Sequence, residues 1–253
     1  MAKPKNTKRI NQYGLTRHID ADVKREIRQR CKFGCAICGL GIYEYEHVDP
    51  EFHEAKAHVA KNMTLLCPSC HAKVTRRIWS KSKVKRASEN PYCVKQGYSN
   101  ESFDLGNEPP FFTLGGVTFK EVTVPIMVKG TPLFKVAPPE NPGEPFRFSG
   151  VFTDSNGEVS LEIIENEWRA STDNWDVEIV GNTITIREKL NKIHLRMTAH
   201  PPDGLTVSKL DMSYEGMSFK GDAEKLTVTF KNGSTFDFIN GRIEEGAVGL
   251  SFS

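Results

Sequence analysis

The sequence predicts an α+β fold in two parts, a small zinc-stabilised module over residues 20–90 and an all-β domain over residues 111–253. Two Cys-x-x-Cys pairs lie in the first third of the chain, and short β-type runs separated by turn signals fill the region beyond Phe111. Charge divides in the same way. Residues 1–90 hold 19 Lys or Arg against 9 Asp or Glu, a net charge of +10, whereas residues 91–253 hold 15 against 23, a net charge of −8. Such a split indicates two domains with different partners.

The first part begins with a basic segment, residues 1–19, that we expect to be a flexible arm with little to bury. A helix is predicted from Asp20 to Arg30, because Asp20 can cap its first turn and because Val23 and Ile27 lie one turn apart on an inner face. Residues 31–66 are expected to form two short strands and a long loop.

A second helix is predicted from Pro68 to about Trp79, because proline suits a first turn and Val74 lies four residues before Ile78. Residues 80–91 are expected to be a short helix or a linker. The linker itself is expected over residues 91–110, where the stretch ending in Pro109 and Pro110 marks a boundary.

The second part is expected to be a β-sandwich, a barrel or a coiled sheet. A two-residue turn at Gly181-Asn182 predicts a hairpin that pairs Ile179 with Ile184 on one face. A similar turn at Asn232-Gly233 would pair Thr229 with Phe236, so either a bulge shifts this register or both faces are partly buried.

The cysteine spacing predicts a structural zinc site. Cys35 and Cys38 form one pair, and Cys67 and Cys70 form a second pair 29 residues later. Four thiolates complete a tetrahedral shell and leave zinc no open position for a substrate. Cys31 and Cys93 have no partner at ligand spacing and are expected to be ordinary reduced thiols.

Four further residues need another explanation, because the thiolates already fill the zinc shell. Glu46 and His47 follow an aromatic, acidic strand, Asn62 opens the segment before Cys67, and His71 directly follows the last zinc cysteine. A single histidine is usually a polar surface residue. A second task is indicated by three residues placed around one zinc fold, His47, Asn62 and His71.

At these residues the sequence resembles the HNH endonucleases, which belong to the ββα-metal nuclease group. The resemblance extends from about Arg28 to Ser80, and His47, Asn62 and His71 correspond to the three letters of the family name. Glu46 stands where Asp is more usual. The Gly-Gly often found in the intervening loop is replaced by residues 51–58, in which we expect His53 and His58 to be loop residues.

The resemblance implies hydrolysis of a phosphodiester bond with one divalent ion. His47 is the expected general base, because imidazole titrates near neutral pH. Glu46 and His71 are the expected ligands of a catalytic Mg²⁺ or Mn²⁺, and a histidine ligand would also admit other divalent ions. Asn62 either orients the His47 ring through its carbonyl or joins the metal shell, and both alternatives stay open.

DNA is the expected partner of this module. Lys73, Arg76 and Arg77 lie beside His71 and could hold the phosphates that flank the cut, and because Arg76 and Arg77 are adjacent they point in different directions. The alternatives are an RNA endonuclease or a non-catalytic, zinc-dependent DNA-binding module. For the second part we consider a regulatory ligand or protein, assembly into homo-oligomers, or choice of target. By analogy with the family, restriction or phage defence is a possible setting.

The composition excludes some classes of protein. The chain has no apolar run of the roughly 18 residues that a membrane span requires, and its basic start lacks the apolar segment of a secretory signal. Paired cysteines at metal-ligand spacing fit a reducing compartment. We therefore expect a cytoplasmic protein with no membrane partner.

Overall fold

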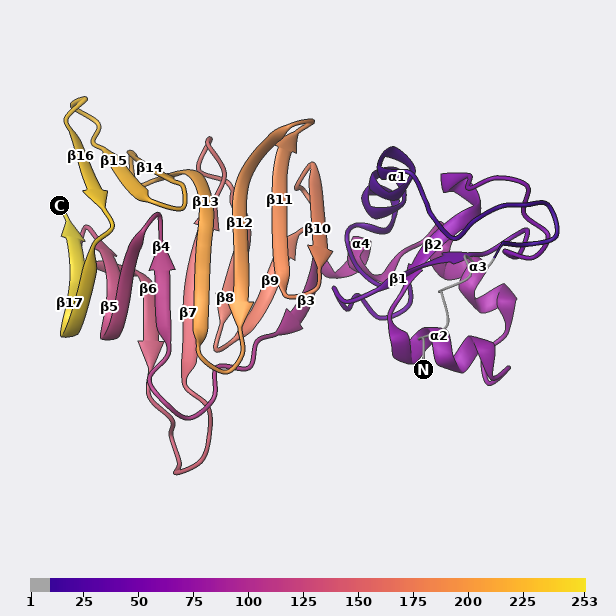
Figure 1. The fold of residues 1–253 in the computed structure, drawn as a ribbon, viewed down its shortest axis with the longest axis horizontal. Helices are drawn as coiled ribbons and strands as arrows, with labels where there is room; N and C mark the ends of the chain where they lie inside the picture. Colours follow the sequence, from indigo (N-terminus) through magenta and orange to yellow (C-terminus); the bar gives the residue numbers. More distant parts are fainter. Residues whose placement is uncertain (1–9) are drawn as a thin grey trace, which may run out of the picture. The chain divides into compact units, whose positions relative to one another are not determined.

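The fold is described by a computed structural model that covers residues 10–253. The chain divides into two compact units, one that ends at Ser99 and one that begins at Asn100 (Figure 1). The first combines helices with a small sheet, and in the described residues the second consists of strands and loops. The predicted α+β organisation is therefore confirmed. No helix among residues 10–253 is long and apolar enough to cross a membrane.

The first unit is built on two short antiparallel strands and a helix. Its elements are α1 (Ala21–Cys31), β1 (Glu44–His47), η1 (Ala60–Asn62), β2 (Met63–Leu66), α2 (Pro68–Thr75), α3 (Lys81–Glu89) and α4 (Tyr92–Gln96). Strand β1 pairs with β2 so that Glu46 lies opposite Thr64 and His47 opposite Met63. Helix α2 follows β2 after a single residue, Cys67, whose sulfur accepts a hydrogen bond from the Cys70 amide.

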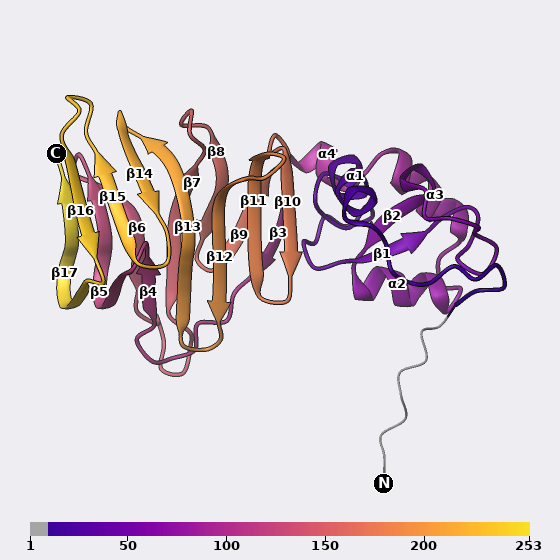
Figure 2. The same ribbon diagram turned by 45° about the horizontal axis from the view of Figure 1, so that its top comes forward.

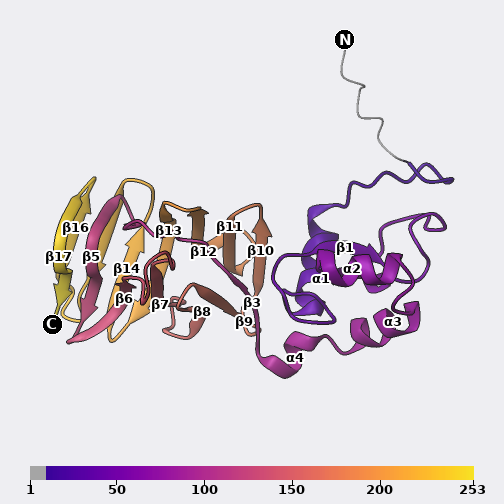
Figure 3. The ribbon, with the colours of Figure 1, turned by 90° about the horizontal axis from the view of Figure 1, so that it is seen from below.

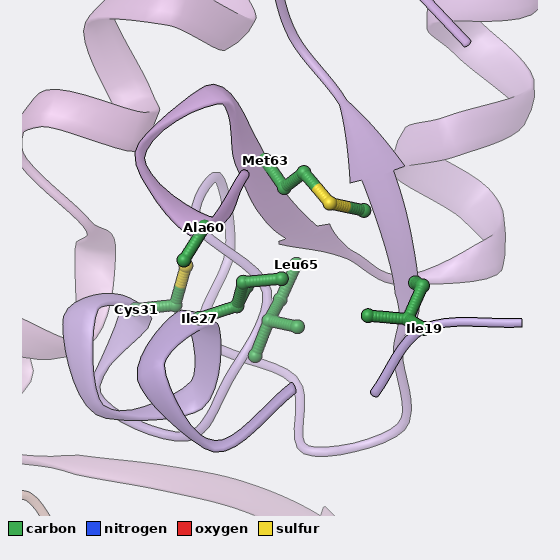
Figure 4. Close-up of a cluster of buried hydrophobic side chains, with 6 residues drawn as sticks. All are labelled: Ile19, Ile27, Cys31, Ala60, Met63 and Leu65. Atoms are coloured by element: carbon green, nitrogen blue, oxygen red, sulfur yellow. The ribbon is translucent and has the colours of Figure 1, made fainter. Parts of the chain in front are cut away.

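A cluster of apolar side chains joins α1 to this small sheet (Figure 4). It consists of buried residues from four separate segments: Ile19, Ile27, Cys31, Ala60, Met63 and Leu65. Ile27 is fully buried and Val23 packs against the cluster, as the predicted inner face requires. The Asp20 backbone is extended at the start of α1, but its side chain makes no capping hydrogen bond.

The predicted end of the second helix is wrong. The second helix ends at Thr75 rather than near Trp79, because Arg77 adopts a left-handed φ of 60° that no α-helix can continue through. Ile78 consequently lies outside the helix and is exposed. Part of the predicted linker is ordered secondary structure, since residues 91–110 contain α4 and most of the strand β3 (Tyr98–Ser102).

The predicted arm is only partly described, because residues 1–9 lie outside the described range. Its later residues contact the folded unit. The Asn11 side-chain amide donates to the carbonyls of Phe52 and Ala55, at 2.6 Å each, and Ile19 is buried. These contacts tie the start of the described chain to the loop that follows β1.

The second unit is one sheet of 15 strands that curls so that β10–β13 face β7–β9 (Figures 1 and 3). The strand order is β10-β11-β12-β13-β4-β5-β6-β7-β8-β9-β3, with β14, β15 and β16 continuing from β13, and β17 added to β5 (Figure 2). A coiled sheet was one of the three predicted forms. The bounds are β4 Phe111–Leu114, β5 Val117–Val128, β6 Thr131–Ala137, β7 Arg147–Thr153, β8 Val159–Ile164, β9 Glu167–Ser171, β10 Asp176–Val180, β11 Thr183–Lys189, β12 Lys192–His200, β13 Gly204–Tyr214, β14 Met217–Gly221, β15 Lys225–Thr229, β16 Thr235–Ile239 and β17 Arg242–Phe252.

The hairpin at Gly181-Asn182 has the predicted register, with Ile179 opposite Ile184 and Val177 opposite Ile186. At the second hairpin Thr229 pairs with Thr235, and Val228 pairs with Phe236. The loop is one residue longer than two, because Phe230 donates its amide to the Ser234 carbonyl and Gly233 adopts a φ of 85°. This shift of one residue corresponds to the bulge alternative.

The core of the second unit contains a cluster of phenylalanine rings. Phe112, Phe134, Phe148 and Phe152 are each at most 1% exposed, and their neighbouring ring centroids lie 4.8–6.0 Å apart. Aromatic pairs at these separations add to the stabilisation that comes from burial alone. The ring cluster therefore links β4, β6 and β7 into one packed body.

We expect Phe152→Ala to lower the free energy of unfolding of the second unit by about 3–5 kcal/mol, because it leaves a cavity among the packed rings. Urea unfolding followed by far-ultraviolet circular dichroism measures this change. The matched control is Phe236→Ala on β16, since Phe236 is 57% exposed, and it should cost less than about 1 kcal/mol. Equal losses in the two variants would contradict the assignment of the core.

Candidate functional site

The four paired cysteines come together in the first unit. Their sulfur atoms all lie within 4.8 Å of one another, and among residues 10–253 this is the one group of three or more metal-ligating side chains that could hold an ion. The Cys38 sulfur is 3.6 Å from that of Cys67 and 3.7 Å from that of Cys70. In a tetrahedral zinc site with metal–sulfur bonds of about 2.3 Å, neighbouring sulfurs are about 3.8 Å apart. The cluster therefore has the dimensions of a zinc site.

The protonation of these thiols also fits a bound cation. A hydrogen bond from Cys38 lowers the pKa of Cys35 to about 5, whereas burial first, and then the charge of Cys35, raises the pKa of Cys70 to about 12. Without a cation the first thiolate makes it harder for the next thiol to ionise. A divalent ion removes that repulsion and draws all four into the thiolate form.

The remaining two cysteines are buried free thiols outside the four-thiol cluster, as predicted. The Cys31 sulfur is 3.4 Å from the Thr64 hydroxyl, and the Cys93 sulfur donates to the Gly39 carbonyl at 3.6 Å. Burial is the main cause that raises the pKa of both thiols, to about 12 in Cys93. Both are therefore protonated at neutral pH.

Glu46 and His71 meet across β1 and the first turn of α2. The Glu46 carboxylate Oε2 is 3.2 Å from His71 Nε2, and the Glu44 carboxylate Oε2 is 2.9 Å from His71 Nδ1. Glu44 was not predicted. The sequence did contain a signal for it. Residues two apart on a strand point to the same face, so the side chain of Glu44 lies on the same face as that of Glu46.

These three side chains line an open depression of about 920 Å³ in the first unit. Arg77 and Lys81 also line it. The Lys81 ammonium group is 3.6 Å from Glu46 Oε1 and 3.5 Å from the Glu51 carboxylate. The depression thus combines carboxylates that suit a cation with basic groups that suit a phosphate.

His47 follows Glu46 on β1 and therefore points to the opposite face of the strand. It is 6% exposed, and it is not among the residues that line the depression. Its Nε2 atom lies 3.0 Å from His58 Nδ1, and the His58 Nε2 atom lies 2.9 Å from the Thr16 carbonyl. The centre of the Phe52 ring lies 5.7 Å from the centre of the His47 ring, in an edge-to-face arrangement. Phe52 also lines the depression, so it contacts both His47 and the depression.

The pKa of His47 is lowered from its usual value. Burial is the largest cause, the positive charges of His58 and Arg17 act in the same direction, and the Pro50 carbonyl opposes them. The Nδ1 atom of the ring is buried and has no hydrogen-bond partner among the described residues. His47 is consequently neutral at pH 7 and able to accept a proton.

Asn62 lies at the end of η1, where its backbone carbonyl accepts the Val48 amide at 2.8 Å. This bond holds the chain directly after His47. Within residues 10–253 no hydrogen bond joins the Asn62 side chain to His47, whose Nε2 has His58 as its neighbour instead. The sequence treated His58 as a loop residue, because residue spacing cannot reveal a contact made across a loop.

The predicted phosphate-binding residues separate in space. The Lys73 ammonium group lies 4.6 Å from the centre of the Trp79 ring, and Lys83 lies over the same ring at 3.6 Å. Arg76 and Arg77 follow the end of α2 and are both exposed. Arg77 lines the depression, whereas Arg76 is not among its lining residues.

Comparison with known proteins assigns a family to this region alone. Residues 29–77 match the model of the HNH endonuclease family, so the first unit contains an HNH endonuclease domain. The match includes all four paired cysteines, Glu46, His47, Asn62 and His71. Neither the curated proteins nor the solved structures contain a significant match to the chain. The match supports a nuclease or nucleic-acid-binding role.

We expect Cys70→Ser to remove the tightly bound metal and unfold the first unit, because a structural zinc ion contributes on the order of 10 kcal/mol to the folding of a small module. Elemental analysis gives the metal content, and limited proteolysis of the region before Ser99 reports its folding. Cys93→Ser is the control, since Cys93 lies outside the cluster, and it should retain the metal. A Cys70→Ser protein with a full metal content would contradict the assignment.

Proposed function

We propose that this protein is a metal-dependent endonuclease that hydrolyses phosphodiester bonds of DNA. The observation that carries the proposal is the meeting of Glu46 and His71 in the depression that Arg77 and Lys81 also line, within the segment that matches the HNH family. We further propose zinc for the four-cysteine site and Mg²⁺ or Mn²⁺ for the depression.

The hydrogen-bonding capacity of His71 supports a cation between it and Glu46. The Glu44 carboxylate can only accept at His71 Nδ1, so the proton of a neutral ring lies there. The lone pair on Nε2 then faces the Glu46 oxygen at 3.2 Å, an arrangement that repels unless a proton or a metal ion lies between the two atoms. Neighbouring ligands of an octahedral Mg²⁺ are about 3 Å apart, so this separation fits an ion.

In this arrangement Glu44 orients His71 from outside the metal shell, as carboxylates commonly do for metal-binding histidines. A divalent ion, when bound, neutralises the charge that gathers on the phosphate and the leaving oxygen as the bond breaks. We assign to His47 the acceptor role for the proton of the attacking water on the ground of its place in the HNH match, although its ring lies on the opposite face of β1, outside the depression. Its lowered pKa keeps it in the neutral form that this role requires.

The charge distribution supports a nucleic acid as the substrate. The net charge of +10 in residues 1–90 attracts a polyanion, and Arg77 stands where it could contact a phosphate beside the metal ligands. The net charge of −8 in residues 91–253 acts against binding of the same polyanion by the second unit. RNA is the alternative substrate, and matched DNA and RNA duplexes of one sequence distinguish the two.

We expect the purified protein to nick or linearise plasmid DNA with Mg²⁺ or Mn²⁺ and to be inactive in EDTA. His47→Ala should reduce cleavage by at least about 100-fold, because general-base catalysis contributes roughly 10²–10⁴-fold. Zinc content and DNA affinity should not change, since His47 belongs to neither the thiol cluster nor the depression. Cleavage by His47→Ala at the wild-type rate would refute the role of His47, and metal-independent cleavage would refute the mechanism.

We expect Arg77→Ala to weaken DNA binding and to reduce the slope of log K against log salt by about one, because one phosphate contact is lost. Arg76→Ala is the matched control, since it removes the same charge from the neighbouring position outside the depression. Arg76→Ala should lower the DNA affinity and the salt slope clearly less than Arg77→Ala does. Fluorescence anisotropy with a labelled duplex at several salt concentrations measures both variants, and equal effects would count against a phosphate site in the depression.

A further inference from the structure

We propose that the second unit binds a sugar ring in a cavity between the facing parts of its curled sheet, with His194 and Asp154 as polar contacts. The ligand class is a small polyhydroxylated ring, which occurs as a free saccharide or as the ribose of a nucleoside. The site lies entirely within residues 154–194, so the proposal does not depend on the proposed nuclease activity.

An open cavity of about 310 Å³ lies in the second unit. Its lining comes from the loop after β7, the start of β8, the loop between β9 and β10, the end of β11 and the start of β12. Because β10–β13 face β7–β9, the two parts of the curled sheet form opposite walls of the cavity (Figure 3). Small-molecule sites commonly occupy about 300–1,000 Å³, so a ligand of one ring fits this volume.

The side chain that assigns a ligand to this cavity is His194. It lines the cavity, it is 1% exposed, and neither of its ring nitrogens has a hydrogen-bond partner among the described residues. Within residues 10–253 it is the one side chain with two such buried atoms. Buried polar atoms are normally paired, because leaving them unpaired opposes folding. A polar ligand in the cavity would supply the partner.

A β-bulge turns His194 inward. Leu195 of β12 pairs with Ile186 of β11, and Ile193 pairs with Arg187, so His194 is an extra residue with no partner on β11. Side chains of a regular strand alternate between the two faces, yet His194 and Leu195 are both buried. Bulges often re-aim a side chain beside a functional site. The fold therefore directs a polar ring to a place where an apolar one would cost less.

The hydrogen-bonding capacity of His194 restricts the ligand. Burial is the largest cause that lowers the pKa of His194, so the ring is neutral at pH 7 and presents one N–H donor and one lone pair. A phosphodiester oxygen only accepts, and an ammonium group only donates. A hydroxyl group does both, so it can pair with either ring nitrogen in either tautomer.

The charged groups of the lining also disfavour an anionic ligand. The Arg187 guanidinium lies 3.1 Å from the Asp176 carboxylate and 2.8 Å from the Glu178 carboxylate. Lys192 forms an ion pair with Glu188. These two cations are therefore already neutralised within the protein, and a phosphate would gain little from them.

Asp154 provides an acceptor for a hydroxyl group. Its Oδ1 atom accepts the backbone amides of Asn156 and Glu158, at 2.8 and 2.9 Å, and these bonds hold the loop after β7. Its Oδ2 atom lies 3.4 Å from the Asn156 side-chain amide, so it retains capacity to accept from a ligand. Trp175 also lines the cavity and adds an aromatic surface of the kind against which the C–H face of a sugar packs.

The first test measures binding by the full-length protein with saturation-transfer difference NMR. D-Glucose, D-galactose and D-ribose are the free-saccharide probes, and adenosine is the nucleoside probe. We expect saturation transfer to at least one probe, its loss in His194→Leu, and a several-fold weaker signal in Asp154→Asn. No transfer to any of these probes, or transfer that is unchanged in His194→Leu, would overturn the proposal.

The probes also distinguish the two sources of the ligand. Transfer to adenosine alone indicates a nucleoside, and transfer to the free sugars alone indicates a saccharide. Transfer to both groups indicates that the sugar ring itself is recognised. In each case the loss of transfer in His194→Leu places the probe in the cavity rather than in the first unit.

The second test uses no ligand. His194→Leu removes two unpaired polar atoms and keeps a side chain of similar size, so the unliganded variant should be at least as stable as the wild type, with a Tm up to about 4 °C higher. Differential scanning calorimetry of the full-length protein measures this shift. A Tm below that of the wild type would show that His194 supports the fold and would overturn the proposal.

His200→Leu is the matched control for both tests. His200 lies on the same strand and is half-buried, but its Nε2 atom is 3.1 Å from the Thr206 hydroxyl and it is outside the lining of the cavity. Its replacement removes a hydrogen bond, so it should lower Tm and leave the binding of the probes unchanged. Loss of probe binding in His200→Leu equal to that in His194→Leu would refute a specific role for His194.

Discussion

The four-thiol cluster is the interaction on which the first unit depends. It joins the turn at Cys35 and Cys38, which precedes the sheet, to Cys67 and Cys70 at the start of α2. The two apolar clusters of this unit are small, so such a link adds to its stability. Because Cys70 is followed directly by His71, the same cluster also places the candidate metal ligand against β1. The position of His71 therefore depends directly on the folding of the thiol cluster.

The alternation of side chains along β1 separates the chemistry into two faces. Glu44 and Glu46 point toward His71 and the open depression, whereas Tyr43 and Tyr45 pack against the apolar cluster and His47 is buried beside His58. The face with the carboxylates is accessible to ions and phosphates. The other face is shielded, which lowers the pKa of His47 and limits the positions that its ring can take. Two adjacent residues thereby acquire different electrostatic surroundings.

The second unit has its own core and a different charge. Its phenylalanine rings are buried between parts of one curled sheet, and its strands reach across long stretches of sequence through the parallel pairs β13–β4 and β17–β5. The apolar clusters of the first unit are made of separate residues. Each unit therefore has its own source of stability. The acidic charge of the second unit favours a task other than binding the phosphate backbone of a nucleic acid.

The sequence by itself determined the features that depend on residue spacing. These are the shared cluster of four thiols, the two strands and the helix around it, the segment that matches the HNH family, and the register of the hairpin at Gly181-Asn182. Each follows from a local repeat or from ligand spacing. Tertiary structure alone decided that His58 contacts His47, that Glu44 flanks His71, that α2 ends before Arg77, and that β13 pairs with β4. The physical reason is that these contacts, and the backbone conformation at Arg77, depend on residues distant in the chain. The spacing of residues within one segment does not indicate which distant residues will be in contact after folding.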